Sequence, residues 1–273
     1  RRSEVTNLTT QFRAGGNITR IVEGDITDEA VSLIAGGDIT QQATNIFDIS
    51  VDDTTFESTR SIAAEARIAK GGGGGAEQSQ GTQVSALGGA GGSSGGGKSG
   101  TSKGVAVNLS ASASESSSSS SRAITSRYQA GGNITSTTTG ITSFDAAQFE
   151  AGGSIDISGD TVEFLAAENT TAQSGFSTSV GLSTGKNTGT GERSGNVEFG
   201  YGQYDNSSSE AVTSTLSAGG GINIRARGDT TLQGAQLDAG VDVNLISTEG
   251  NVRLEAAQST RDEFAFAVNA SAS

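Results

Sequence analysis

The stretch Ala14-Gly15-Gly16-Asn17-Ile18-Thr19 decides the fold, because its first three residues return along the chain at a regular spacing. The copies that keep this spacing begin at Ala35, Ala130, Ala151 and Ala218 and, in a degenerate form, at Ala239. The copies form three pairs, and within each pair they lie 21 residues apart. The chain is therefore built from three modules, and each module holds two copies of a 21-residue unit.

Apolar residues keep the same positions in all three modules when the modules are aligned on Ala14, Ala130 and Ala218. A residue predicted to be buried follows each of these alanines by 4, 19 and 25 places. We expect the core to contain Ile18, Leu33, Ile39, Ile134, Phe149, Ile155, Ile222, Leu237 and Val243.

A period of 21 residues, with short Thr/Ile/Val segments between glycine turns, is typical of one coil of a parallel β-solenoid. Each coil would bond its backbone to the coils on either side, and the absence of proline suits strands that donate in both directions. Glycines would form the corners, where we expect positive φ angles and close stacking to exclude a Cβ. The predicted corner glycines are Gly15, Gly16, Gly24, Gly36, Gly37, Gly131, Gly132, Gly140, Gly152, Gly153, Gly219, Gly220 and Gly228.

The sequence predicts a single elongated solenoid over residues 1–273, interrupted by excursions. We place the repeat modules at about 5–56, 123–173 and 212–263. The excursions fall at about 57–122, which is rich in Gly and Ser, at 174–211, and at 264–273. Roughly seven coils would span about 35 Å at the strand spacing of a sheet.

The second excursion carries the pattern of a long hairpin. Residues 176–182 and 197–204 both alternate apolar with small or polar side chains, and residues 264–268 alternate in the same way. Such amphipathic strands suit either packing against the rod or contact with a membrane, and we expect packing. Gly71 to Gly75 lacks the Gly-Lys-Ser/Thr that follows in a phosphate-binding loop, and it is interpreted as a loop tip.

Composition excludes several kinds of chemistry. The chain has 41 glycines in 273 residues and lacks histidine and cysteine, so it cannot form a Ser-His-Asp or Cys-His site, or a disulfide. Zinc and haem sites of the usual ligand types are excluded for the same reason. A net charge of −13 disfavours nucleic acid. We therefore predict no catalytic residue, no cofactor and no dedicated metal site.

Paired carboxylates are the remaining argument for an enzyme, because some parallel β-helices act on polysaccharides. Glu163 with Glu168, or Asp52 and Asp53 with Glu57, could form a general acid/base pair. Asp52-Asp53, or Asp156 with Asp160, could also bind stray calcium through oxygen ligands. The acids are scattered among serines and threonines, and the chain has no tryptophan to form a sugar platform. Solvated faces are the preferred interpretation.

Two kinds of local motif also fit the repeat itself. Arg227-Gly228-Asp229 is an integrin-recognition tripeptide, but Gly228 also occupies a corner position of the solenoid. Asn-Ile-Thr is both a glycosylation sequon and the expected start of a strand after a turn. Sequons occur at Asn7, Asn17, Asn108, Asn133, Asn169, Asn206 and Asn269.

Three stretches carry a family resemblance: Ala14–Thr19 and its copies, residues 227–236, and the alternating Ser/Ala tract 109–114. They resemble the haemagglutinin repeats of filamentous-haemagglutinin-type exoproteins. These are large bacterial two-partner secretion proteins that include the contact-dependent growth inhibition effectors. The resemblance covers nearly the whole chain except 71–100. It implies a right-handed parallel β-helix that is exported through an outer-membrane transporter and displayed at the cell surface.

This resemblance implies a non-enzymatic filament segment that acts in cell–cell contact and toxin delivery. The alternative is an adhesin stalk that contacts host or neighbouring cells. The expected partners are the outer-membrane two-partner secretion transporter and the target-cell envelope or a host surface. The expected location is secreted or at the bacterial cell surface. The chain opens at Arg1-Arg2-Ser3 without a methionine, and we interpret it as an internal fragment of a longer protein.

Overall fold

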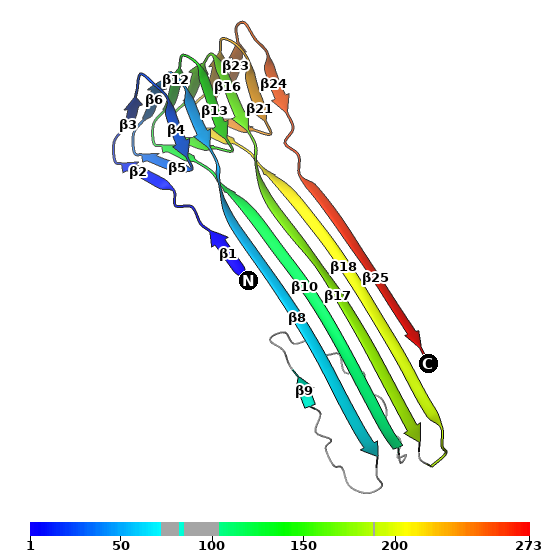
Figure 1. Ribbon diagram of the computed structural model, residues 1–273. Coiled ribbons are helices and arrows are strands. Elements are labelled where there is room, and N and C mark those ends of the chain that lie inside the picture. Colours follow the sequence, from blue (N-terminus) through cyan, green and yellow to red (C-terminus); the bar gives the residue numbers. More distant parts are fainter. Residues whose placement is uncertain (72–81, 85–103, 188) are drawn as a thin grey trace.

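The computed structural model describes residues 1–71, 82–84, 104–187 and 189–273. Every regular element in this part of the chain is a β-strand, and the strands form two structures (Figure 1). One is a short column of stacked coils. The other is a sheet of long strands that extends away from the column.

The column consists of three parallel sheets of six strands, and each coil contributes one strand to each sheet. The first sheet contains β2 (Thr10–Ala14), β5 (Val31–Ala35), β11 (Arg127–Ala130), β14 (Gln148–Ala151), β19 (Thr215–Ala218) and β22 (Gln236–Ala239). The second contains β3 (Ile18–Ile21), β6 (Ile39–Ala43), β12 (Ile134–Thr138), β15 (Ile155–Gly159), β20 (Ile222–Ala226) and β23 (Val243–Ser247). The third contains β4 (Ile26–Glu29), β7 (Ile46–Ile49), β13 (Ile141–Asp145), β16 (Thr161–Leu165), β21 (Thr230–Gln233) and β24 (Val252–Glu255). The right-handed parallel β-helix expected from the repeat is confirmed.

The register follows the repeat. Ile18 pairs with Ile39, Ile39 with Ile134, and Ile134 with Ile155, so the isoleucine after each Ala-Gly-Gly lies on its equivalent in the next coil. The described part of the chain forms six coils, and the estimate of roughly seven was therefore too high. The difference arises because the long strands leave the column earlier than expected. At about 4.8 Å per coil, the six coils span about 29 Å.

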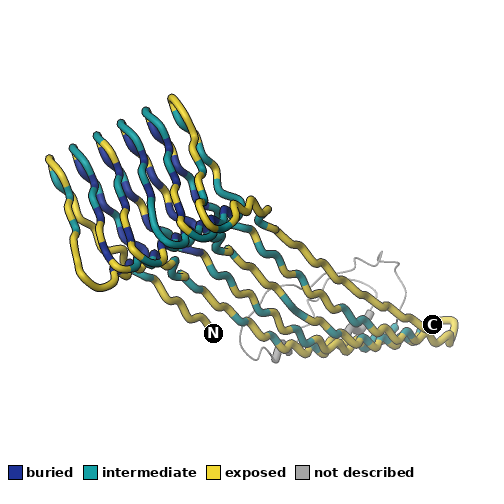
Figure 2. Tube along the Cα trace, turned by 90° about the horizontal axis from the view of Figure 1, so that it is seen from above, coloured by how far each residue is buried: buried dark blue, intermediate teal, exposed yellow. Residues whose placement is uncertain are grey.

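The core runs inside the column, where Figure 2 shows the buried residues. Six of the expected core residues are buried, with exposures of 0–2%: Leu33, Ile39, Ile134, Phe149, Ile155 and Ile222. Ile18 and Leu237 are partly buried and pack against this core. Val243, by contrast, is 46% exposed, because β23 is the last strand of its sheet and no further coil covers it.

The corner glycines are required by stacking and not by backbone angle. A Cβ on Gly36 would overlap the carbonyl oxygen of Gly15 in the previous coil, and Gly131, Gly152 and Gly219 have the same relation to the glycine before them. The expectation of positive φ at these corners was wrong. Among described glycines, only Gly191 and Gly234 have positive φ.

The remaining corner positions differ in how tightly they stack. A Cβ on Gly37, Gly132, Gly153 or Gly220 would meet a side-chain oxygen of the preceding coil. A Cβ on Gly140 or Gly228 would meet backbone or side-chain oxygens beneath it, whereas Gly15, Gly16 and Gly24 have open space. These last three belong to the first coil, which has no coil before it in this chain. A stacking requirement therefore begins only with the second coil.

The second structure is an antiparallel sheet in the order β1-β8-β10-β17-β18-β25, with β9 paired to β8. Its strands are β1 (Arg2–Val5), β8 (Val51–Gly71), β9 (Thr82–Val84), β10 (Gly104–Ile124), β17 (Ala167–Asn187), β18 (Arg193–Val212) and β25 (Thr260–Ala272). The strands start at Val51 and Ala167, whereas we placed the excursions from 57 and 174. Gly72 to Gly75 of the glycine run lie outside the described residues.

The hairpin strands do not pack against the column, and this corrects the expectation for 197–204 and 264–268. The long strands extend side by side away from the coils in a single layer (Figures 1 and 2). Phe199, Phe264 and Phe266 remain 45%, 54% and 50% exposed. The alternating pattern was correct for a strand with two unlike faces, but the column does not cover the apolar one.

Candidate functional site

The two faces of the hairpin sheet follow from strand alternation. In β17, the even-numbered residues Phe176, Val180 and Leu182 point to one side of the sheet. The odd-numbered residues Ser177 and Ser179 point to the other side. The register carries this division across the sheet. Leu182 lies between Leu109 of β10 and Val197 of β18, so the apolar side chains of neighbouring strands lie on one face.

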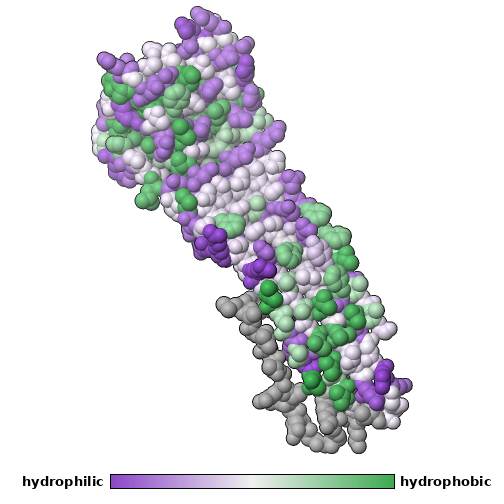
Figure 3. Space-filling model, viewed as in Figure 1, coloured by the Kyte–Doolittle hydropathy of each residue, from purple (hydrophilic) through white to green (hydrophobic). Residues whose placement is uncertain are grey.

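This apolar face occupies the half of the sheet farther from the column. Figure 3 shows its hydrophobic side chains gathered over the far part of the long strands. Its large members are 40–66% exposed: Ile62, Ile68, Val105, Leu109, Phe176, Val180, Leu182, Val197, Phe199, Phe264, Phe266 and Val268. At standard strand dimensions the face measures roughly 27 Å by 24 Å. Its area of roughly 600 Å² reaches the upper end of the apolar patches found on soluble monomers.

A shallow hollow lies near the middle of the apolar face. Its volume is about 390 Å³. The side chains of the apolar face that line this hollow come from three neighbouring strands: Ala64, Ala66, Leu109, Ala111, Val180 and Leu182. The hollow exists because the three alanines lie beside longer Leu and Val side chains, and these apolar side chains offer dispersion contacts.

Charged side chains border the apolar face at both ends, toward the column and toward the tip of the sheet. Lys186 of β17 and Arg193 of β18 are paired across the strands at the tip, on the same side as Leu182. Nearer the column, the same side carries Glu115, which lies opposite Phe176, and Asp205, which lies opposite Phe264. The face is therefore bordered by cations at its far end and mainly by acids toward the coils.

The opposite face is covered by small polar side chains. Ser61 and Ser114 hydrogen-bond at 2.8 Å across β8 and β10, and Thr171 and Ser208 do so at 2.7 Å across β17 and β18. Its large aromatic residue, Tyr204, lies over Gly175, where an added Cβ would come within 2.8 Å of two ring carbons and the hydroxyl oxygen. This use of Gly175 was not recognised in the sequence, because a glycine opposite an aromatic residue is visible only once the register is known.

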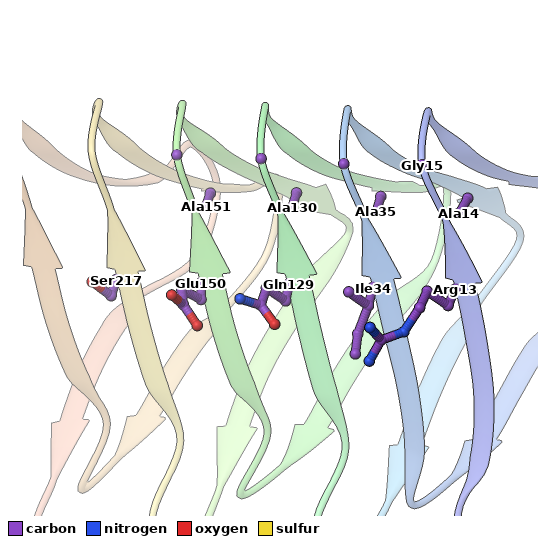
Figure 4. A pocket seen from close by; sticks show the side chains of 13 residues that line it. Arg13, Ala14, Gly15, Ile34, Ala35, Gln129, Ala130, Glu150, Ala151 and Ser217 are labelled. Atoms are coloured by element: carbon purple, nitrogen blue, oxygen red, sulfur yellow. The ribbon is translucent and has the colours of Figure 1, made fainter.

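The column has a shallow outer groove beside the Ala-Gly-Gly corners. One outward side chain from each successive coil lines it, and Figure 4 shows these side chains in a row: Arg13, Ile34, Gln129, Glu150 and Ser217. Its volume is about 630 Å³. The row mixes a cation, an apolar group, an amide, an acid and a hydroxyl without bringing two titratable groups together. It lacks the convergence that a catalytic site needs.

The candidate acid pairs are separated or engaged elsewhere. Asp53 accepts a hydrogen bond of 2.6 Å from the backbone N–H of Asn7, and Glu168 accepts one of 2.9 Å from Ser209. Asp156 accepts from Asn223 at 2.8 Å, and Asp160 accepts from Arg227 at 2.7 Å. Within the described ranges, no group of three or more acidic residues could hold a metal ion.

The Arg227-Gly228-Asp229 tripeptide is built into the ladder of the coils. Arg227 forms an ion pair with Asp160 of the preceding module at 2.6 Å, and Asp229 forms one with Arg253 at 3.3 Å. The backbone N–H of Asn251 donates to Asp229 at 2.8 Å, and this bond lowers the pKa of the Asp229 carboxyl below its usual range. These contacts give the tripeptide a structural role in coil stacking.

The described residues contain no helix of the length and apolarity that crossing a membrane requires. A family model described as haemagglutinin repeat matches residues 107–270, which is more than half of the chain. The match covers the second and third modules together with the long strands β17 and β18. Searches of curated proteins and of solved structures both return no significant match.

Proposed function

Because the chain belongs to the haemagglutinin-repeat family, we propose that it is a filament segment of a large bacterial exoprotein that acts in cell contact and toxin delivery of the contact-dependent growth inhibition type. The family is structural and adhesive and is not typically enzymatic. It supports a secreted or cell-surface adhesin or stalk of the filamentous haemagglutinin kind. Delivery of a toxin into a neighbouring cell is the more specific part of this proposal, beyond the general role of an adhesin or stalk.

The single observation that supports the proposal is the uncovered apolar face of the hairpin sheet. Val180, Leu182 and Phe199 lie at its centre and are 49%, 42% and 45% exposed. A contiguous apolar surface of this size is costly in water and marks a place of interaction. We assign it to contact with the envelope of the target cell, whose lipids offer an apolar layer beneath anionic headgroups.

The charges bordering the face suit this orientation. Lys186 and Arg193 at the tip would meet the anionic headgroups, and each such cation near the surface contributes about 1 kcal/mol. The chain as a whole carries −13, so a column pressed against the same surface would be repelled. The sheet would therefore make the contact while the column stays outside.

The column serves as a stiff spacer in this proposal. Each new coil can add its strands to the edges of the coil before it, which suits a chain that leaves the cell unfolded. We propose the outer-membrane two-partner secretion transporter as the partner for export. In the alternative, the segment is the stalk of an adhesin that touches host or neighbouring cells. The mixed side chains of the outer groove support it, because one exposed group per coil forms an extended contact surface.

The test compares a charge placed on either face of the same strand. Leu182→Glu introduces a carboxylate into the apolar face, and Ser183→Glu places one on the polar face one residue further on. We expect the first variant to lower the partition onto outer-membrane vesicles, measured by co-flotation, by at least about tenfold, since burying a leucine contributes about 1.5–3 kcal/mol. The Ser183→Glu variant is expected to bind like the unmodified chain.

Equal binding of both variants would contradict envelope contact through this face. Binding that survives Leu182→Glu but disappears after protease treatment of target cells would favour the adhesin alternative. Delivery is tested in the intact exoprotein, where Leu182→Glu should remove inhibition of neighbouring cells while display at the producing cell's surface stays unchanged.

A further inference from the structure

One row of side chains inside the column changes from acidic to apolar along its length. One inward row of the third sheet passes from coil to coil in direct register: Asp28, Asp48, Phe144, Phe164, Leu232 and Leu254. Four positions of this row are apolar, and the first two are acids. Asp28 is 4% exposed and Asp48 is 1% exposed, so two adjacent carboxyl groups are buried in the bore of the column.

The two acids have different partners. Arg20 donates from its two terminal nitrogens to both oxygens of Asp28, at 2.7 and 2.6 Å, and this fork geometry fits an ionised carboxylate. The partners of Asp48 are neutral hydroxyl groups. Ser126 Oγ donates to Asp48 Oδ1, and Tyr128 Oη lies 3.1 Å from Asp48 Oδ2. The single cation of the cluster therefore compensates Asp28 and leaves Asp48 without a counter-charge.

The number of protons available for hydrogen bonding also indicates that Asp48 is protonated. Tyr128 Oη lies 3.1 Å from Asp28 Oδ2 and 3.1 Å from Asp48 Oδ2, but a phenol has one proton to donate. With both carboxylates ionised, one of these contacts would bring two oxygen atoms together without a proton between them. A proton on Asp48 Oδ2 resolves the conflict, because Asp48 then donates to Tyr128 and Tyr128 donates to Asp28.

The other groups around Asp48 do not supply the missing charge. Asp145 of β13 is a further acid, and its repulsion, together with that of Asp28, disfavours an ionised Asp48. Glu163 of β16 acts on Asp145 in the same way. Burial raises the pKa of Asp48 to about 7, and the neighbouring acids raise it further against the lowering effect of Ser126 and Tyr128. Burial also raises the pKa of Tyr128 well above its usual range, so the phenol keeps its proton.

The cluster lies where the first hairpin joins the column. Asp48 is in β7, three residues before β8 begins at Val51, and Ser126 lies between the end of β10 and the start of β11. Ser126 Oγ also accepts the backbone N–H of Val31 at 2.9 Å. The Ser126–Asp48 bond thus ties together the two chain segments that lead into and out of the hairpin.

We propose that Asp48 is a buried proton-binding site and that Asp48, Ser126 and Tyr128 form a pH-dependent clamp at the root of the first hairpin. The folded chain holds the proton more tightly than the unfolded chain. The stabilisation is therefore complete below the ordinary pKa of an aspartate, about 3.9, and is lost as the pH rises to about 7. Above that pH, Asp48 and Asp28 are adjacent buried anions, and the root loosens.

The second hairpin provides an internal control. Ser214 occupies the place of Ser126 and accepts the backbone N–H of Ala147 at 3.1 Å, as Ser126 accepts that of Val31. The position equivalent to Asp48 is Phe164, which is buried against Phe144 with ring centroids 5.3 Å apart. The root of the second hairpin has the same geometry without a titrating group in this row.

Hydrogen exchange of the 273-residue chain between about pH 5 and pH 8, corrected for the intrinsic rate, tests the clamp. Amides at the first root, 51–56 and 119–124, should lose protection by at least about tenfold over this interval, while the second root, 167–170 and 209–212, stays within about twofold. Asp48→Asn, which keeps a donor and an acceptor without charge, should remove the pH step. Asp145→Asn should keep it. A flat profile in the unmodified chain, or a step that persists in Asp48→Asn, would overturn the proposal.

A second measurement covers the case in which Asp48→Asn fails to fold. Infrared spectroscopy of the Asp145→Asn chain, with its aspartates isotopically labelled, should show a protonated carboxyl at about pH 6, where aspartates of ordinary pKa are ionised. The band should disappear as the pH is raised above about 8. Absence of the band at pH 6 would show that Asp48 is ionised and would overturn the proposal.

Discussion

At the scale of single residues, glycine controls how closely the coils approach. Gly152 lies directly over Gly131, and a Cβ on Gly152 would overlap the carbonyl oxygen of Gly131. Because that oxygen belongs to the backbone of another coil, the contact can be relieved only by separating the strands. The backbone N–H of Gly152 donates to Ala130 at 3.0 Å, so separation would also weaken the ladder.

Gly152→Ala is therefore expected to lower the free energy of unfolding by about 1–3 kcal/mol, the usual cost of overpacking. Gly15→Ala is the matched control. It occupies the same corner of the first coil, where a Cβ would find open space, and it should change stability by less than about 0.5 kcal/mol. Urea unfolding followed by circular dichroism measures both. Equal losses in the two variants would mean that stacking does not explain the glycines.

Positive φ occurs at a different place from the predicted corners. Ala30, Ala146 and Gly234 each lie 16 residues after the first Ala-Gly-Gly alanine of their module, and their φ angles are 49°, 52° and 64°. This turn precedes the second coil of each module. The sequence did not indicate it, because alanine carries no signal for a left-handed backbone conformation, and only the third module has glycine there.

At the scale of elements, aromatic side chains fill the middle of the column. Tyr128 stacks on Phe149 with ring centroids 4.7 Å apart, and Phe149 meets Phe144 edge-on at 4.9 Å. These rings come from the third and fourth coils and hold the first sheet against the third. Phe12 occupies the equivalent position of the first coil, where it is 52% exposed, whereas Phe149 is 2% exposed.

Phe149→Ala should cost about 3–5 kcal/mol, because it removes a buried ring and leaves a cavity beside Tyr128 and Phe144. Phe12→Ala should cost less than about 1.5 kcal/mol, since half of that ring already contacts water. Thermal unfolding of the two variants gives the comparison. A similar cost for both would show that the central coils are not packed as described.

The repeat predicted the column well because each inward row is set by residues 21 apart. It placed Leu33, Ile39 and Phe149 in the core, since stacking of equivalent residues is the only way a coil can bury them. Alternation in 197–204 could not predict what lies over the apolar face, because packing and exposure give the same pattern. The acids at Asp28 and Asp48 were not recognised as buried, because carboxylates usually face solvent and only the register places them inside.

At the scale of the whole molecule, stiffness and contact are divided between two structures. The column is closed by three sheets around a buried core, and the hairpin sheet carries the uncovered apolar face. The long strands of 20 or 21 residues extend roughly 65 Å, more than twice the length of the six coils. The contact surface is therefore held well away from the filament axis.

The most direct measurement is hydrogen exchange of the chain with and without outer-membrane vesicles. Without vesicles, the account predicts slow exchange in the coils, above all in β12 and β15. With vesicles, it predicts new protection in 176–186, 197–205 and 264–272 and no change in the coils. New protection confined to the Ala-Gly-Gly corners, or no new protection at all, would contradict the assignment of the hairpin sheet as the contact surface.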